Sequence, residues 1–456
     1  MKKGDLIEGT VSDIKFPNKG VVETEDGVCI VKNAITRQRV RARVCKKRKG
    51  RAEGTLIEVL ERSEAERETP CPAFGTCGGC TYLCLPYQEQ CAIKEKQVRD
   101  LLGEALPEGS SMDWFEGILE SPARYGYRNK MEFSFGDSYK DGPLALGMHK
   151  RGSFYDIVNA DDCVIVDEDY RRILTAVRTY WDRKGAAYFH RVRRTGYLRH
   201  LLVRKAVNTG EILIDLVTTS QETYDLQDFA DALVSLELEG TIVGILHTVN
   251  DSVADVIRDD GTEVLYGRGY FAETLLGLEF TVTPFSFFQT NSRGAELLYD
   301  TARRFLREAG MKRGVVYDLY CGTGTISQLM APVSEKVIGV EIVEEAVEAA
   351  GENARRNRIE NCEFIAGDVL KVLDSITDLP DLIILDPPRD GVHPKALPKI
   401  LGYGVEQILY ISCKPTSLAR DIPAFTEAGY KPVRGVCVDQ FPWTANVETI
   451  VLFCKT

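Results

Sequence analysis

Long apolar runs are absent from this 456-residue sequence. No stretch approaches the ~20 consecutive apolar residues that a membrane-spanning helix needs. The opening residues, MKKGDLIEGTVSD, contain no apolar signal segment. Internal repeats and low-complexity tracts are also missing, while the 44% hydrophobic and 27% charged content is ordinary for a globular protein. We therefore expect a cytoplasmic protein of two or three domains with no membrane partner.

Histidine is scarce, and an excess of positive charge is absent. The five histidines show no metal-ligand spacing, and the net charge of −11 argues against a protein that coats nucleic acid uniformly. Basic residues nevertheless gather between Arg37 and Arg51. Such a patch can follow phosphates, but a strand edge kept positive to prevent aggregation explains it equally well.

Cysteine, by contrast, is abundant. The thirteen cysteines are an odd number and several are clustered, which in a reducing compartment indicates metal, cluster or catalytic use more than disulfides. Cys71, Cys77 and Cys80 form C-x5-C-x2-C around Gly78-Gly79, and all-cysteine ligation suits zinc or an iron–sulfur cluster. Free thiols in a loop are the alternative. A fourth ligand is needed, and the candidates are Cys84, Cys91 and Cys163.

The first sixty residues consist of short β-type runs divided by Gly, Asn and Asp turns. Five such strands predict a small barrel of the OB type, which is often used for nucleic acid. A charged linker follows at 61–68, and an amphipathic helix is expected from about 88 to 106, before Pro107. The predicted strands cover 6–14, 20–23, 27–31, 40–44 and 55–60.

Aromatic and basic residues are interleaved in the middle of the chain, where a mixed β and α pattern covers 125–285. YGYRNKMEFSF places Arg128 and Lys130 among aromatic rings, and 190–205 is again basic. This combination suits single-stranded RNA, whose bases stack while cations hold its phosphates. A β-sheet with charged outer faces accounts for it equally well.

Strands and helices alternate toward the end of the chain, which predicts a doubly wound, mostly parallel sheet. Two last strands, 433–439 and 447–453, are close enough to pair as an antiparallel edge. In such sheets ligands bind at the carboxyl ends of the parallel strands. These strands are expected at 315–320, 336–340, 363–366, 381–385 and 408–411.

A glycine-rich turn follows the first of these strands and indicates the cofactor. The turn, DLYCGTGT, lacks the third glycine of a dinucleotide fingerprint and the lysine of a P-loop. Its acidic first residue would repel a phosphate but accept a hydrogen bond from an ammonium group, which favours S-adenosylmethionine over NAD. Glu341 ends the next strand, where ribose hydroxyls are often bound. We assign cofactor binding to Asp318, Tyr320, Gly322, Gly324, Glu341, Asp368 and Asp386.

The strand 408–411 ends at Cys413, which puts a thiol at the ligand-binding edge. Lys414 and Arg420 are near in sequence and could favour a thiolate. On its own, the stretch is typical of a buried core cysteine.

Together these motifs resemble the RNA uracil-5 methyltransferases, especially the bacterial branch that modifies 23S ribosomal RNA. The similarity covers nearly the whole chain, and its motifs are PFSFFQTN, DLYCGTGTIS, DPPRDG, SCKPTSLARD and DQFPWTANVET. It implies a multidomain α/β protein: a TRAM β-barrel (1–62), a mixed central domain with an iron–sulfur loop and an RNA-binding sheet (63–285), and a Rossmann-like S-adenosylmethionine-dependent methyltransferase domain (286–456).

The resemblance also implies roles for single residues. Cys413 would add to carbon 6 of uracil, which activates carbon 5 toward the methyl group, and Glu448 would then remove the carbon-5 proton. Gln289 would lie at the methionine part of the cofactor or at the target base. Cys71, Cys77, Cys80 and Cys163 would hold a 4Fe–4S cluster in place of zinc. Arg128, Lys130, Phe287 and Arg389 are expected to bind RNA.

The predicted function is methylation of carbon 5 of a uridine in 23S rRNA by a monomeric enzyme. The same chemistry on the T-loop uridine of tRNA is an alternative. A non-catalytic iron–sulfur RNA-binding protein is another, although the presence of Cys413, Glu448 and Gln289 argues against it. Trp443-Thr444-Ala445-Asn446 departs from the His-Thr-x-His of many members. We expect a structural cluster, because its loop is far in sequence from the catalytic motifs.

Overall fold

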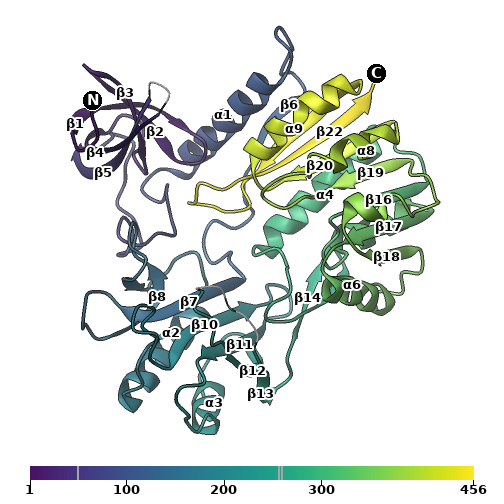
Figure 1. The fold of residues 1–456 in the computed structure, drawn as a ribbon. Helices are drawn as coiled ribbons and strands as arrows, with labels where there is room; N and C mark the ends of the chain where they lie inside the picture. The colour runs from purple at the N-terminus through teal and green to yellow at the C-terminus, as the bar shows by residue number, and fades with distance from the viewer. Residues whose placement is uncertain (49–50, 255–256, 258–259) are drawn as a thin grey trace.

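The computed structural model describes residues 1–456 except 49–50, 255–256 and 258–259. Figure 1 shows a small barrel at the upper left, a central sheet below it and a third sheet at the right. Lys49 and Gly50 belong to the predicted basic stretch and lie outside the described residues. Among the described helices, none has the length and apolar character needed to cross a membrane.

The N-terminal segment forms a closed barrel with the strand order β1-β2-β3-β5-β4, which confirms the predicted fold of this region. Alternating residues point inward, so that Val11, Val22 and Val40 are at most 1% exposed. The first three expected strands match the observed ones to within one residue, whereas β4 and β5 extend four residues further toward each other than expected. The observed strands are β1 (Leu6–Lys15), β2 (Lys19–Thr24), β3 (Gly27–Lys32), β4 (Arg39–Arg48) and β5 (Arg51–Glu61).

The predicted basic patch lies on β4 and β5, and acidic partners neutralise part of it. Arg39 pairs with Glu61 at 3.0 Å, and Arg41 pairs with Glu8 at 2.7 Å and with Glu58 at 2.6 Å. The exposed basic side chains of β4 that form no ion pair among the described residues are Arg43, Lys46 and Lys47.

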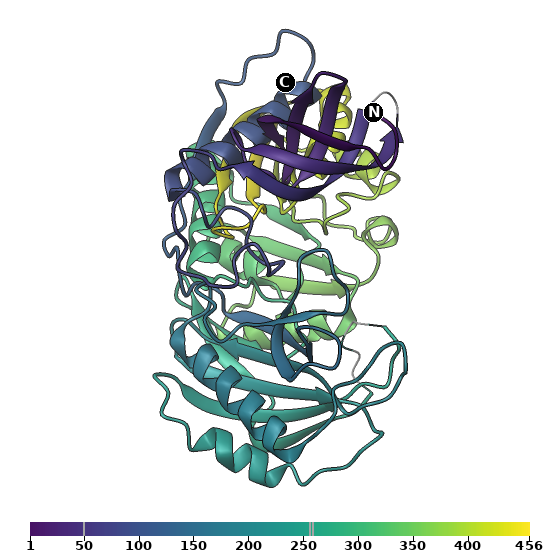
Figure 2. The ribbon, with the colours of Figure 1, turned by 90° about the vertical axis from the view of Figure 1, so that its left-hand side faces the viewer.

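The central sheet has seven strands in the order β13-β12-β11-β10-β7-β8-β9. The helices α2 (Glu168–Lys184) and α3 (Gln227–Val234) cover one face, where Trp181 and Phe229 are fully buried. Figure 2 shows both helices on the side turned away from the C-terminal sheet. The strands are β7 (Lys130–Asp137), β8 (Leu144–His149), β9 (Ile157–Asn159), β10 (Leu198–Lys205), β11 (Glu211–Thr218), β12 (Thr241–Val249) and β13 (Thr262–Gly267).

A short antiparallel pair, β14 (Phe271–Leu275) and β15 (Leu278–Val282), leads from the central sheet to the C-terminal one. The C-terminal sheet has eight strands in the order β18-β17-β16-β19-β20-β22-β21-β6. The first five run parallel, as predicted. Its strands are β6 (Phe115–Leu119), β16 (Val315–Leu319), β17 (Lys336–Glu341), β18 (Cys362–Ala366), β19 (Leu382–Leu385), β20 (Gln407–Ser412), β21 (Tyr430–Val438) and β22 (Glu448–Lys455).

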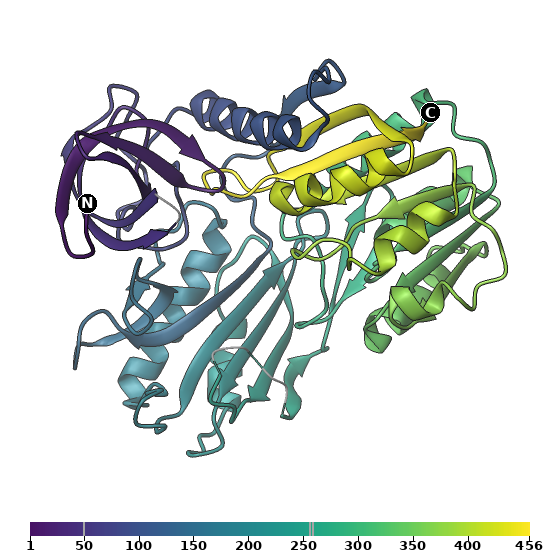
Figure 3. The same cartoon turned by 45° about the horizontal axis from the view of Figure 1, so that its top comes forward.

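Helices on both faces complete a doubly wound C-terminal layer. The long helix α1 packs against the helix α9 and the strand β6, on the outside of this sheet (Figure 3). The helices are α1 (Tyr87–Ala105), α4 (Ser292–Glu308), α5 (Thr325–Met330), α6 (Glu344–Arg356), α7 (Val369–Val372), α8 (Ala396–Gly402) and α9 (Pro415–Glu427), with a 3-10 turn η1 (Ala331–Val333).

Two expectations about this sheet need correction. β21 and β22 do pair antiparallel, but they are not its edge, because β6 lies outside β21 and parallel to it. β6 and α1 come from the segment expected in the central domain (63–285). Val98, Leu102 and Phe115 bury their side chains in the core of the C-terminal sheet, so the sheets do not divide at residue 285.

Candidate active site

Four predicted site residues gather at the carboxyl edge of the C-terminal sheet because their strands are parallel and in register. Leu319 is opposite both Val340 and Leu385, and Leu385 is opposite Tyr410. The strands therefore end at nearly the same level. The residues brought together at this edge are Asp318, Glu341, Asp386 and Cys413.

Cys413 and Glu448 lie next to each other across β20 and β22. Ser412 is paired with Thr449 at the end of this antiparallel ladder, so Cys413 and Glu448 each lie one residue beyond the last pair, and the charge of Glu448 acts on the Cys413 thiol. Glu448 is 2% exposed. Burial and the neighbouring Asp386 raise the pKa of Glu448 to about 8.

The thiol of Cys413 is held in its neutral form. Burial, then the charges of Glu448 and Asp386, raise the pKa of Cys413 to about 12, and Arg389 acts in the opposite direction. The expectation that Lys414 and Arg420 favour a thiolate is therefore wrong.

The guanidinium of Arg420 is engaged elsewhere. It donates to Asp421 at 2.8 Å, and Asp421 in turn accepts from Tyr410 at 2.9 Å and from the backbone of Val392 at 3.2 Å. Ser417 donates to the carbonyl of Arg389 at 2.7 Å. The segment that follows Cys413 thus anchors the loop after Asp386 and does not act on the thiol.

Asp318 is buried at the start of the glycine turn with one oxygen unused. Its Oδ2 accepts from Ser327 Oγ at 2.5 Å, and Oδ1 has no hydrogen-bond partner among the described residues. Burial raises the pKa of Asp318 to about 6. A buried acceptor without a partner is costly unless a ligand supplies a donor, so Oδ1 fits an ammonium group of a bound cofactor.

The turn itself requires glycine. Gly322 and Gly324 have φ of 53° and 74°, and a Cβ on Gly324 would come within 2.8 Å of Phe364. Tyr320 also adopts a positive φ, of 70°. Glu341 accepts from the backbone N–H of Gly322 at 3.1 Å and so fixes the turn to the end of β17.

Asp368 and Asp386 differ in their surroundings. Asp368 is exposed and accepts from the N–H of Leu370 at 2.8 Å, which caps α7. Asp386 is partly buried, and burial together with Asp318 raises its pKa to about 7. Asp386 therefore lies between the glycine turn and the Cys413–Glu448 pair.

The sequence did not reveal Tyr299, which lies on α4 among these groups and is 5% exposed. Burial and Asp386 raise the pKa of Tyr299 well above its ordinary value, Gln289 lowers it, and Glu448 raises it. Tyr299 is therefore a neutral hydroxyl within reach of the carboxylates and of predicted Gln289. Nothing in the helical pattern distinguishes it from a core residue.

The segment that carries Gln289 is held by the central domain. Asn129 donates to the carbonyl of Gln289 at 2.9 Å. Arg204, on β10, donates to the carbonyls of Pro284 at 3.0 Å and Ser286 at 2.5 Å. These contacts join the central sheet to the active-site edge.

Asn291 connects the same segment to the loop that precedes Glu448. Its Oδ1 accepts from Gly294 and caps α4, while its Nδ2 donates to the carbonyl of Gln440 at 2.9 Å. In this loop Asp439 is fully buried and accepts from Lys94 at 2.5 Å and from Tyr87 at 2.8 Å. Helix α1 therefore holds the loop that leads to Glu448 in place.

Trp443 connects the cysteine-rich loop to the loop before Glu448. Its carbonyl accepts from the N–H groups of Thr81 and Tyr82 at 2.7 and 2.9 Å. Its ring stacks on Tyr125 at 5.2 Å and packs in one apolar cluster with partly buried Cys80. The cysteine loop is far from Glu448 in sequence but adjacent to its loop in space, so the reason given for a purely structural cluster does not hold.

Of the three candidates for a fourth ligand, Cys163 lies with the others. Burial raises the pKa of Cys80 strongly, and the charges of Cys163, Cys77 and Cys71 raise it further. Cys84 and Cys91 face other groups, since after burial the pKa of Cys84 responds to Glu66 and that of Cys91 to Asp439. Within the described residues, no three Cys, His, Asp or Glu side chains are arranged to hold a single metal ion.

The residues predicted to bind RNA are split between two places. Phe287 is 67% exposed and lies over Gly322, and exposed Arg389 flanks Cys413. Arg128 donates to the carbonyl of Lys130 at 3.1 Å. Burial and Arg204 lower the pKa of Lys130 to about 8.

Comparisons with known proteins agree on one class of enzyme. The family model described as tRNA (uracil-5-)-methyltransferase matches residues 252–456. An uncharacterized RNA methyltransferase of Clostridium tetani is 48% identical over 99% of this chain and 98% of its own length. Another, of Caldanaerobacter subterraneus subsp. tengcongensis, is 47% identical over 100% of both chains.

One solved structure is similar over the whole fold. The tRNA (uracil-54, C5)-methyltransferase of Pyrococcus abyssi, in complex with S-adenosyl-L-homocysteine, superimposes with a TM-score of 0.77 over 98% of this chain and 99% of its own. At 24% identity this likeness establishes the arrangement of the domains.

Proposed function

Because the chain belongs to the RNA (uracil-5-)-methyltransferase family, we propose that it methylates carbon 5 of a uridine in 23S ribosomal RNA. The observation that supports the reaction is that Cys413 and Glu448 each lie one residue beyond the last β20–β22 pair, at the carboxyl edge of the sheet, with Glu448 close enough to act on the thiol. A nucleophile and a base are the two groups that this chemistry needs from the protein. We propose that the enzyme acts as a monomer.

S-adenosylmethionine supplies the methyl group as a sulfonium when it is bound. Asp318 Oδ1, the buried acceptor without a partner, would receive its ammonium group, and Glu341 would receive its ribose hydroxyls. The other proposed contacts are Tyr320, Gly322, Gly324, Asp368, Asp386 and Gln289.

In the proposed reaction, Cys413 Sγ forms a bond to carbon 6 of uracil, and the electron pair of the 5,6 double bond moves toward carbon 5. Carbon 5 takes the methyl group and then carries both the methyl and a proton. Glu448 removes that proton, the double bond forms again, and the Sγ–carbon 6 bond breaks. Because Cys413 starts as a thiol and Glu448 is a carboxyl of raised pKa, both must lose a proton before their steps.

The RNA would approach from the side where Phe287 and Arg389 are exposed, and the target base must leave its stack to reach Cys413. A flipped base can stack on Phe287 while Arg389 faces its phosphate. Arg128, Lys130 and the free half of the barrel's basic stretch would hold the flanking strand.

We further propose that Cys71, Cys77, Cys80 and Cys163 hold a 4Fe–4S cluster. A soft thiolate set suits a cluster or zinc, and cluster ligands each bind a different iron, so they need not converge on one point. The charges of the four cysteines influence one another's ionisation, which supports their proximity. The cluster would fasten the loop 71–80 to Cys163, beneath Trp443.

The substrate is tested by methyl transfer from labelled S-adenosylmethionine to a 23S rRNA fragment and, separately, to unmodified tRNA. We expect label in the 23S fragment, loss of transfer in Cys413→Ala, and full transfer in Cys454→Ala, a matched cysteine at the far end of β22. Transfer to tRNA alone would favour the tRNA uridine named for the family model and the Pyrococcus abyssi enzyme. Tight RNA binding without transfer to either would support the non-catalytic alternative and contradict the proposal.

A further inference from the structure

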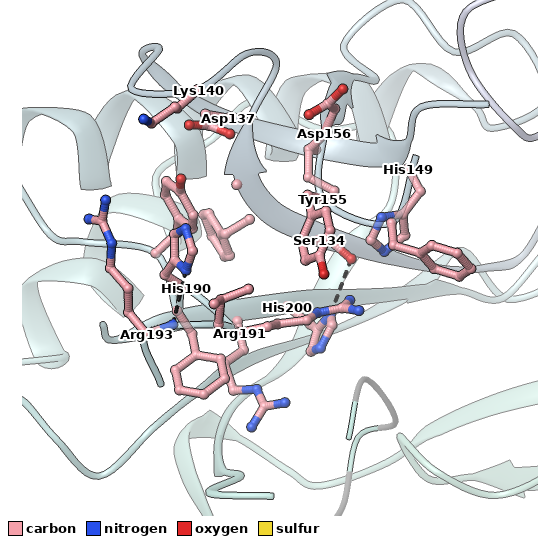
Figure 4. Close-up of a pocket in the computed structure, with 18 of the residues that line it drawn as sticks. Ser134, Asp137, Lys140, His149, Tyr155, Asp156, His190, Arg191, Arg193 and His200 are labelled. Carbon is pink, nitrogen blue, oxygen red and sulfur yellow. Dashed lines mark hydrogen bonds between the residues drawn. The ribbon is translucent and has the colours of Figure 1, made fainter. Parts of the chain in front are cut away.

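A pocket of about 290 Å³ lies in the central domain, away from the candidate active site. It is formed by the ends of β7 and β8, the segment 154–157 and the segment 188–193 before β10. Figure 4 shows Tyr155, His190 and Arg191 facing one another across it. Its size approaches that of small-ligand sites, which begin at roughly 300 Å³.

Aromatic rings are left in solvent at the mouth of this pocket. Phe154 is 80% exposed and Tyr155 is 62% exposed, although both are large rings that usually bury much of their surface. Tyr188 and His190 stack on each other, with centroids 6.4 Å apart. Exposed rings grouped around a cavity are surfaces on which a flat ligand can stack.

Four basic side chains line the pocket, namely Lys140, Arg191, Arg193 and Arg199. Arg193 is exposed, and its guanidinium makes no ion pair or hydrogen bond with any residue that the structure describes. Lys140 lies on the same side in Figure 4. Arg199, by contrast, is occupied by the carbonyls of Asn250, Ser252 and Ala254 at 2.6–2.7 Å. Arg193 is therefore available for an anionic group.

Three carboxylates also line the pocket. Asp137 and Asp156 line the pocket together with Asp141, and Asp156 is only loosely paired with Lys150, at 3.6 Å. His200 at the floor is 3% exposed and contacts Ser134 at 3.3 Å. These carboxylates repel a phosphate but accept bonds from an amino group. Adenine, cytosine and guanine carry such a group, and uracil does not.

The pocket is connected to the active-site edge through β7. Asn129, just before this strand, holds the carbonyl of Gln289, and Asp137 at its other end lines the pocket. Eight residues of strand span about 27 Å. The pocket therefore lies one strand length from the segment that carries Gln289, a span that several nucleotides of an extended RNA strand can cover.

We propose that this pocket binds an unpaired nucleotide with an amino-bearing base, several positions away from the target uridine in the same RNA. The base stacks on Tyr155 and Phe154, its amino group faces the carboxylates, and its phosphate faces Arg193. This inference rests on the proposed RNA substrate and adds to it a second point of recognition.

The test measures RNA affinity by fluorescence anisotropy, without cofactor, using labelled oligoadenylate and oligouridylate of about ten nucleotides, a length within the usual single-strand site sizes. We expect wild type to bind oligoadenylate about tenfold more tightly than oligouridylate. Tyr155→Ala should lose about tenfold in affinity for oligoadenylate with an unchanged salt slope, because stacking is worth that much per base. Arg193→Ala should lower the slope of log affinity against log salt by about 0.7, the value for one phosphate contact on a single strand.

Matched controls are Tyr266→Ala, an exposed ring on β13, and Arg172→Ala, an exposed arginine on α2. The inference is overturned if the pocket variants bind RNA as these controls do while all four unfold like wild type. It is also overturned if AMP alone binds with the affinity of the oligonucleotide and the variants lose only AMP, since the pocket would then take a free nucleotide. Failure of methyl transfer would leave this binding result intact, so the two proposals fail separately.

Discussion

Glu448 affects the ionisation of Cys413, because its carboxylate and that of Asp386 raise the pKa of the partly buried thiol. Glu448 has a pKa of about 8, so it is mostly protonated at neutral pH, and the pKa of Cys413 is raised to about 12. Raised pKa values of this kind are typical of groups that move protons in a catalytic site. A base must be ionised to act, so activity should increase as pH rises through the pKa of Glu448.

Replacing Glu448 tests its role as the base and its effect on the Cys413 thiol in separate measurements. In Glu448→Gln we expect methyl transfer to fall by roughly 10²–10⁴, the usual contribution of a positioned base, and the rise of wild-type activity through about pH 8 to disappear. Alkylation of Cys413, followed by mass spectrometry of its peptide, should become faster than in wild type above pH 8, because the repelling carboxylate is gone.

The control for this change is Glu427→Gln, an exposed carboxylate at the end of α9, which should leave both measurements as in wild type. If activity and its pH profile were unchanged in Glu448→Gln, Glu448 could not be the base.

At the scale of elements, the loop before Glu448 is clamped from three sides. Helix α1 supplies Lys94 to Asp439, the segment 284–291 supplies Asn291 to Gln440, and the cysteine loop supplies two N–H groups to Trp443. Trp443 adopts a positive φ of 68°, a conformation that a bulky residue keeps only when its surroundings enforce it. A metal cluster bound in the cysteine loop would therefore influence the position of Glu448, the proposed base.

The proposed 4Fe–4S cluster lies in this cysteine loop, and its iron content can be measured. Protein purified without oxygen should contain about four irons and four sulfides per chain, as a 4Fe–4S centre requires. Cys163→Ser should lose most of the iron, whereas Cys84→Ala, a buried cysteine outside the proposed set, should keep it. Zinc in place of iron in wild type, or equal iron in both variants, would contradict the assignment.

For the whole molecule, the barrel and the parallel strands could be predicted because apolar periodicity and turn residues define each of them locally. The membership of β6 and α1 in the C-terminal sheet could not, since Phe115 and Leu102 become core residues only through packing on strands more than 300 residues away. The proposed roles of Cys413 and Glu448 came from motif resemblance. Tyr299 and the engagement of Arg420 by Asp421 depend on three-dimensional neighbours and left no signal in the sequence.

The central claim is that Cys413 bonds to carbon 6 of a uracil in RNA. The most direct measurement mixes anaerobically purified protein, S-adenosylmethionine and a 23S rRNA fragment that carries 5-fluorouridine, followed by denaturing electrophoresis. Fluorine at carbon 5 cannot leave as a proton does, so the adduct should persist as a shifted band and vanish in Cys413→Ser. A shift that survives in Cys413→Ser, or no shift with either rRNA or tRNA from protein that binds cofactor and RNA, would contradict the covalent mechanism.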